Sequence, residues 1–101
     1  MADKIKIVFS KTGEARFISH LDLMRLFQRA ARRAALDVVV TKGFNPHLKI
    51  SIARALKLGV ESHSEEAIFH MDERTDSRKF TESINEKLPN GIKVLKAEEL
   101  F

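Results

Sequence analysis

The sequence predicts an α+β domain of the ferredoxin-like kind, with the element order βαββαβ. Three observations lead to this prediction: extended segments with a period of two, two segments with apolar residues at helical spacing, and their order along the chain. The chain has 101 residues, which suffices for a single domain with one modest core. We expect an antiparallel sheet with both helices on one face.

The first strand is predicted over residues 4–10, because Ile5, Ile7 and Phe9 recur with a period of two. A loop around Gly13 follows. A helix is then predicted to begin after Ser19, a residue type typical of the N-cap, and to end near residue 35. Its apolar residues recur at helical spacing and form the stripe expected in the core: Leu23, Phe27, Ala30, Ala31 and Ala34.

The second strand is predicted in two pieces. Residues 37–41, DVVVT, are rich in β-branched side chains, and residues 48–53, LKISIA, resume an extended pattern. The segment GFNPH at 43–47 interrupts them. Residues 54–65 are predicted to form a loop.

Residues 66–72, EAIFHMD, predict a third strand. Asp76 or Ser77 is the expected N-cap of a second helix, whose apolar positions are Phe80, Ile84 and Leu88. Residues 92–99 predict the last strand. The sheet face without helices should be mixed in polarity and suited to RNA, a partner protein or more of the same chain; we expect it to carry Lys4, Lys6, Val8, His70, Ile68 and Leu95.

Composition narrows the classes of function. The net charge of +4 favours an anionic partner, most often a nucleic acid. The chain has no cysteine, hence no thiolate metal site, and no metal ligand set or cofactor motif is recognisable in it. No apolar run approaches the ~20 residues that span a bilayer, and the N-terminus does not resemble a secretion signal. A cytoplasmic location without membrane contact is therefore expected.

The first predicted helix carries a second stripe. Arg25, Arg29 and Arg32 follow the spacing i, i+4, i+7, with Arg33 beside them, and Asp22 can neutralise part of their charge. Guanidinium groups on one face suit phosphate oxygens, because each offers a fork of donors. The alternative is that these arginines only favour a solvated helix.

Two further clusters could form a specific site. Arg16, Ser19 and His20 gather at a predicted helix N-terminus, where free backbone N–H groups favour an anion. Ser19 could instead serve only as a cap, with His20 packed at the edge. In GFNPH, proline removes a ladder donor, so the strand must break or bulge and could direct Asn45 and His47 out of the sheet. A purely structural kink is the alternative.

Catalysis is not the leading prediction. His20 and His47 are the minimum for acid–base cleavage of RNA, but no spacing shows that they meet. Carboxylates at residues 61, 65 and 66 are expected to be solvated in a loop. Phe17 or Phe44 could stack on a base if exposed; otherwise each belongs to the core.

Three motifs, in order, carry a family resemblance: KTGEARFISHLDLMRLFQRAARRA, GFNPHLKIS and LKLGVES. Together they resemble the bacterial radical-SAM-linked domain of unknown function, which is fused to or encoded beside cobalamin-binding radical-SAM proteins. The resemblance implies a radical-SAM enzyme as partner and a family domain longer than this chain, with residues 1–101 as its N-terminal part. The family's motif residues correspond here to Arg16, Phe17, Ser19, His20, Asp22, Arg25, Arg29, Arg32, Gly43, Asn45, Pro46, His47, Ser51, Gly59 and Glu61.

The leading functional expectation is a non-catalytic accessory domain that binds RNA, or an RNA–protein assembly, and presents it to the partner enzyme. Two alternatives remain open: a module that docks on that enzyme through the open sheet face, and a metal-independent ribonuclease. The residues expected to bind phosphate are Arg25, Arg29, Arg32 and Arg33, and those expected to form a specific site are Arg16, Ser19, His20, Asn45 and His47.

Overall fold

The computed structural model describes residues 3–55 and 58–100, so Leu56 and Lys57 of the third motif lie outside the described residues. Four strands and two α-helices alternate as the sequence predicts, with a short 3₁₀ helix added after the first strand. The elements are β1 (Asp3–Lys11), η1 (Gly13–Phe17), α1 (His20–Arg33), β2 (Ile50–Ile52), β3 (Ser62–Met71), α2 (Ser77–Lys87) and β4 (Ile92–Leu100).

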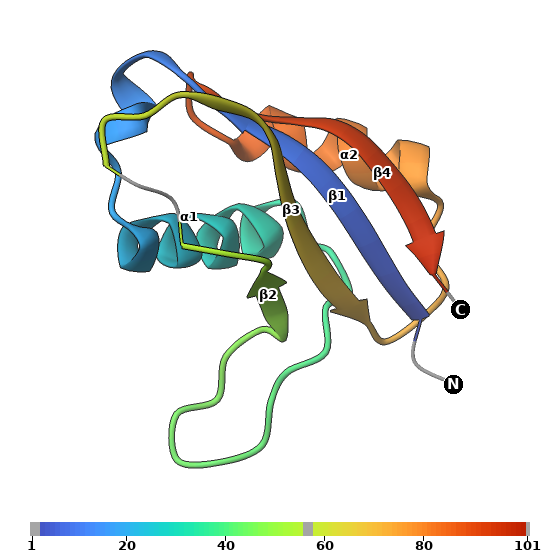
Figure 1. The fold of residues 1–101 in the computed structure, drawn as a ribbon. Helices are drawn as coiled ribbons and strands as arrows, with labels where there is room; N and C mark the ends of the chain where they lie inside the picture. The colour runs from blue at the N-terminus through green and yellow to red at the C-terminus, as the bar shows by residue number, and fades with distance from the viewer. Residues whose placement is uncertain (1–2, 56–57, 101) are drawn as a thin grey trace.

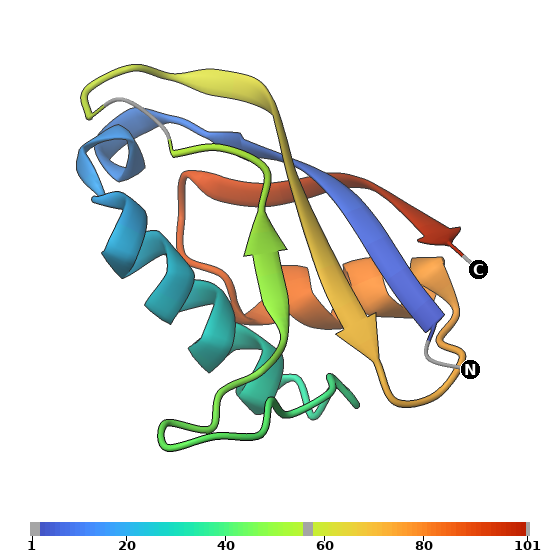
Figure 2. The same ribbon diagram turned by 60° about the horizontal axis from the view of Figure 1, so that its bottom comes forward.

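The four strands form one antiparallel sheet in the order β2-β3-β1-β4. This is the strand order of a ferredoxin-like fold, so the predicted fold class is confirmed. Both helices cover the same face of the sheet, with α1 beside β2 and α2 beneath the other half (Figures 1 and 2). The remaining face is open.

The core lies between the sheet and the helices. Its centre is a row of four phenylalanines whose neighbouring rings meet edge to face, with centroids 5.0, 5.9 and 5.0 Å apart. Two rings come from strands and two from helices, so the row joins both layers. The row consists of Phe9, Phe27, Phe69 and Phe80. Phe27 and Phe80 belong to the apolar stripes that helical spacing predicted.

The open face is mixed in polarity, as predicted. Lys6 pairs with Glu66 at 3.2 Å across two strands, and Leu95 is exposed. His70 is half-buried there; burial lowers the pKa of its imidazole, and the charges of Lys49 and Lys4 lower it further.

Three local predictions are corrected. Residues 37–41 form no named strand and make only isolated bridges, Val38 to Met71 and Val40 to Leu48. Gly13 opens a 3₁₀ helix, not an irregular loop. β3 begins at Ser62, so the last part of the expected 54–65 loop is strand.

GFNPH is a chain reversal and not a bulge within a continuous strand. The Thr41 N–H donates to the His47 carbonyl at 2.8 Å, and the bridge between Val40 and Leu48 lies just outside this bond. Residues between α1 and β2 therefore run out beyond the sheet and back (Figure 1). Pro46 is tolerated because it lies in this exposed reversal, where no ladder donor is needed.

Candidate functional site

The arginines of helix α1 face solvent because the local sequence determines where the helix begins and which of its faces is buried. The Ser19 hydroxyl accepts a hydrogen bond from the Asp22 N–H at 3.1 Å, which confirms the predicted N-cap. Leu23 and Phe27 are buried against the sheet. The opposite face is therefore turned to solvent, and all four predicted arginines on it are exposed: Arg25, Arg29, Arg32 and Arg33.

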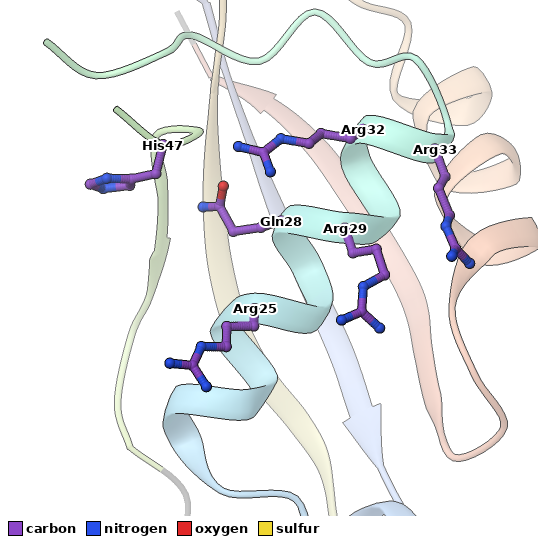
Figure 3. A pocket seen from close by; sticks show the side chains of 6 residues that line it. All are labelled: Arg25, Gln28, Arg29, Arg32, Arg33 and His47. Carbon is purple, nitrogen blue, oxygen red and sulfur yellow. The ribbon is translucent and has the colours of Figure 1, made fainter. Parts of the chain in front are cut away.

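A hollow of about 410 Å³ lies along this helix face. Figure 3 shows Arg25, Gln28 and Arg32 directed toward the segment that carries His47, whereas Arg29 and Arg33 lie on the other side of the helix. Among the described residues, those lining the hollow carry no carboxylate; they are Arg25, Gln28, Arg29, Arg32, Arg33 and His47.

Most of this positive charge is uncompensated. Arg25 is 3.5 Å from the Asp22 carboxylate, and both side chains are largely exposed, so this pair is weak. Within residues 3–55 and 58–100, the other three guanidinium groups make no hydrogen bond or ion pair: Arg29, Arg32 and Arg33.

Gln28 was missed by the sequence analysis, although it is central to the geometry. Its Nε2 donates to the Leu48 carbonyl at 2.7 Å, and its Oε1 accepts from the Leu48 N–H at 2.9 Å. These two bonds fix the segment that leads into β2 against the helix, and so place the backbone at His47 beside the arginine face. A polar amide between an apolar stripe and an arginine stripe was the signal that could have revealed it.

His47 is exposed and held by its own loop. Its Nδ1 lies 2.9 Å from the Asn45 carbonyl oxygen, so Nδ1 carries the proton in this bond. Its ring is turned away from the helix, on the far side of the segment that carries it (Figure 3). Nε2 therefore remains available to a ligand at the border of the hollow.

The two sequence clusters are not brought together. Ser19 and His20 lie at the start of α1, and Gln28, which holds the segment next to His47, lies eight residues further on. At 1.5 Å per residue, that separation is about 12 Å along the helix axis. His20 is half-buried, and its Nδ1 has no hydrogen-bond partner among the described residues.

Arg16 and Phe17 form a small unit at the helix N-terminus. The Arg16 guanidinium carbon lies 4.3 Å from the centroid of the Phe17 ring, and Arg16 Nη1 donates to the Gly13 carbonyl at 2.8 Å. A second hollow of about 510 Å³ opens beside this unit. It is lined by Phe17, Ile18, Asp22, Arg25, Leu26 and Arg29.

Glu65 corrects the expectation of a solvated loop carboxylate. It is 1% exposed in β3, faces the helices, and receives two hydrogen bonds from Arg54 at 3.0 and 2.9 Å. Hydrogen bonding from Arg54 holds the pKa of Glu65 below its ordinary value against the opposing effect of burial, and Ser62 adds to the lowering. Buried Lys11 donates to the Ile18 carbonyl; burial lowers its pKa, and the charge of Glu65 opposes this.

Glu61, also expected to be solvated, is exposed but engaged, since its Oε2 accepts from the Gly13 N–H at 2.7 Å. The Glu61 contact joins this segment to the start of η1, and the Glu65 contacts join its two ends, Arg54 and Ser62. In the part of the chain that the structure describes, no group of three or more His, Cys, Asp or Glu residues could hold a metal ion. Likewise, no described helix is both long and apolar enough to cross a membrane.

The fold and this helix face define a small ferredoxin-like α+β domain with a basic surface hollow. A family model described as an uncharacterized protein conserved in bacteria (DUF2344) matches residues 4–101, so the chain belongs to this bacterial family. A comparison with curated proteins finds no match.

Proposed function

We propose that this domain binds RNA, alone or within an RNA–protein assembly, through helix α1 and presents it to a radical-SAM partner enzyme without itself being a catalyst. The observation that carries the RNA-binding part is the hollow lined by four arginines, three of which have no partner among the described residues. The partner enzyme is proposed from the resemblance of the three sequence motifs.

The arrangement suits a run of phosphates. Arg25 and Arg29 are four residues apart and Arg32 is seven residues from Arg25, which corresponds to a rise of about 6 and 10 Å along the axis. Arg25 and Arg32 point toward the His47 segment and Arg29 to the other side of the helix (Figure 3), so an RNA strand that crosses the exposed face of α1 can contact all three. Like charges this close repel one another in the free protein, and bound phosphates relieve that repulsion.

His47 and Gln28 support the same proposal. Gln28 fixes the position of the His47 segment beside the arginines, and the free Nε2 of His47 can accept a hydrogen bond from an RNA hydroxyl or amino group. This gives the site one group that is not a simple cation. It is the part expected to contribute selectivity, because phosphate contacts alone carry no sequence information.

The test is binding of a labelled unstructured RNA, followed by fluorescence anisotropy at about 50 and 200 mM salt. The variant is Arg25→Ala/Arg29→Ala/Arg32→Ala. The control is Arg78→Ala/Lys79→Ala/Lys87→Ala, which removes the same charge from exposed positions on α2.

With three phosphate contacts, the logarithm of the wild-type affinity should fall with the logarithm of salt concentration with a slope of about −2. The α1 variant should lose both binding and salt dependence, whereas the α2 variant should keep most of each. Equal losses in both variants would show that net charge acts without a defined site. No binding by the wild type would reject the proposal.

Presentation to the partner is tested separately. The chain, the RNA and the radical-SAM protein should form a ternary complex in size-exclusion chromatography that the α1 variant does not form. A complex of chain and enzyme that excludes RNA would instead favour protein docking.

A further inference from the structure

Phe17 occupies an unusual position for an aromatic residue. It is 56% exposed at the end of η1, a segment in which Ala15 is the buried residue. Arg16 lies over its ring, and Gly59 packs beside it, since a Cβ added at Gly59 would be 3.7 Å from Phe17 Cε1. The ring is thus held in place by its neighbours without being covered by the core.

The hollow beside Phe17 has lining residues in common with the arginine site. It shares Arg25 and Arg29 with the 410 Å³ hollow and adds the apolar side chains of Ile18 and Leu26. Its lining thus combines an aromatic ring and aliphatic side chains with two guanidinium groups, one of which pairs with the Asp22 carboxylate that also lines the hollow. This is the combination that a nucleotide requires, with a flat base at one end and a phosphate at the other.

We propose that the hollow between Phe17 and Arg29 holds an unpaired nucleotide, with its base stacked on Phe17 and its phosphate bound by Arg25 and Arg29. The inference rests on the proposed function and narrows its ligand to single-stranded RNA. In a duplex, base faces are already stacked on one another, so Phe17 would have no face to contact.

Phe44 provides the matched control. It is also a phenylalanine and is 104% exposed, but it lies in the GFNPH reversal and lines neither of these hollows. A contribution from any exposed aromatic ring would be lost equally in both variants. A contribution from stacking in the hollow would be lost only at Phe17.

The experiment compares the wild type, Phe17→Ala, Phe17→Leu and Phe44→Ala. Each is titrated with an oligouridine of about 12 nucleotides, a usual site size for single-strand binders, and with a duplex of the same length. Phe17→Ala should weaken oligouridine binding about tenfold, the loss expected for one stacked base. Phe17→Leu should recover little of this affinity, and Phe44→Ala should bind as the wild type does.

A direct readout accompanies the affinities. With phenylalanine rings isotopically labelled, the Phe17 ring protons should shift upfield in NMR spectra at saturation with oligouridine, and those of Phe44 should not. Thermal unfolding should be nearly unchanged in Phe17→Ala, because the ring is more than half exposed.

The outcomes separate the two proposals. Full affinity in Phe17→Ala, together with loss in the α1 arginine variant, would reject the stacked base and leave phosphate binding intact. If the wild type bound duplex and single-stranded RNA with equal affinity, the proposal that the ligand is single-stranded RNA would be rejected. Loss of radical-SAM protein binding without loss of RNA binding in Phe17→Ala would assign the hollow to a protein contact. A wild type that binds no RNA would reject both proposals.

Discussion

Gln28 on α1 and Leu48 just before β2 are joined by two hydrogen bonds, one to each backbone polar group of Leu48, across 20 residues of sequence. The second half of the fold repeats the device. Asn85 on α2 donates to the Val94 carbonyl at 3.0 Å and accepts from its N–H at 2.8 Å. Each helix therefore fixes a neighbouring strand through one side-chain amide.

These two amides give the first prediction. Gln28→Ala leaves the N–H and C=O of buried Leu48 without partners and should lower the free energy of unfolding by about 2 kcal/mol. Asn85→Ala should cost a similar amount, measured by urea unfolding. Only Gln28→Ala should speed amide hydrogen exchange at Leu48 and weaken RNA binding. Equal effects of both variants on RNA binding would show that Gln28 has no specific role in placing His47.

Asp22 limits the positive charge of α1. Asp22→Asn removes the carboxylate that pairs with Arg25. RNA affinity should rise about threefold, because this carboxylate no longer repels the RNA phosphates. The same change should lower stability by about 0.5 kcal/mol, since a negative charge near a helix N-terminus is favourable. Anisotropy and urea unfolding measure the two effects. Glu82→Gln on α2 is the control, and an equal affinity gain there would exclude a local effect.

Glu65 should make stability depend on pH. Its pKa is lower in the folded protein than in the unfolded chain, so its stabilisation is complete above the ordinary glutamate pKa of about 4.3. It is lost as pH falls through the lower folded pKa. Glu65→Gln should cost about 3 kcal/mol at pH 7, because it removes the charged partner of Arg54 and the charge near buried Lys11.

The measurement is urea unfolding from pH 7 down to about pH 3. The Glu65→Gln curve should be flatter at the acidic end than the wild-type curve. Glu66→Gln, the exposed neighbour that pairs with Lys6, should cost less than about 1 kcal/mol. An unchanged acid slope in Glu65→Gln would show that other carboxylates control it.

Ala35 follows the C-cap of α1 and has a left-handed backbone conformation, with φ of 55°. The Leu36 N–H donates to the Ala31 carbonyl at 3.1 Å, which closes the end of the helix. Glycine adopts this conformation without steric cost, so Ala35→Gly should stabilise the protein by about 1 kcal/mol. Ala34, directly before it, has right-handed helical angles, and Ala34→Gly should destabilise by up to about 1 kcal/mol. Urea midpoints of the two variants should therefore move in opposite directions.

Much of the fold could be predicted because its signals are short-range. Alternation in residues 4–10, the spacing of Phe80 and Ile84, and the caps at Ser19 and Asp76 each depend on residues within one or two turns. The exposure of the arginines followed from the same periodicity, since burying one helix face exposes the other.

The sequence by itself thus determined the four strands and two α-helices in outline, their order and the basic face of α1, but not η1 or the irregular course of residues 37–41. The tertiary structure decided which distant groups meet: Gln28 with Leu48, Glu65 with Arg54, and Phe17 with Arg25 at one hollow. It also placed GFNPH in a reversal and His20 and His47 near different parts of α1. The physical reason is that periodicity and capping are local, whereas buried polar groups must find partners wherever the folded chain brings them.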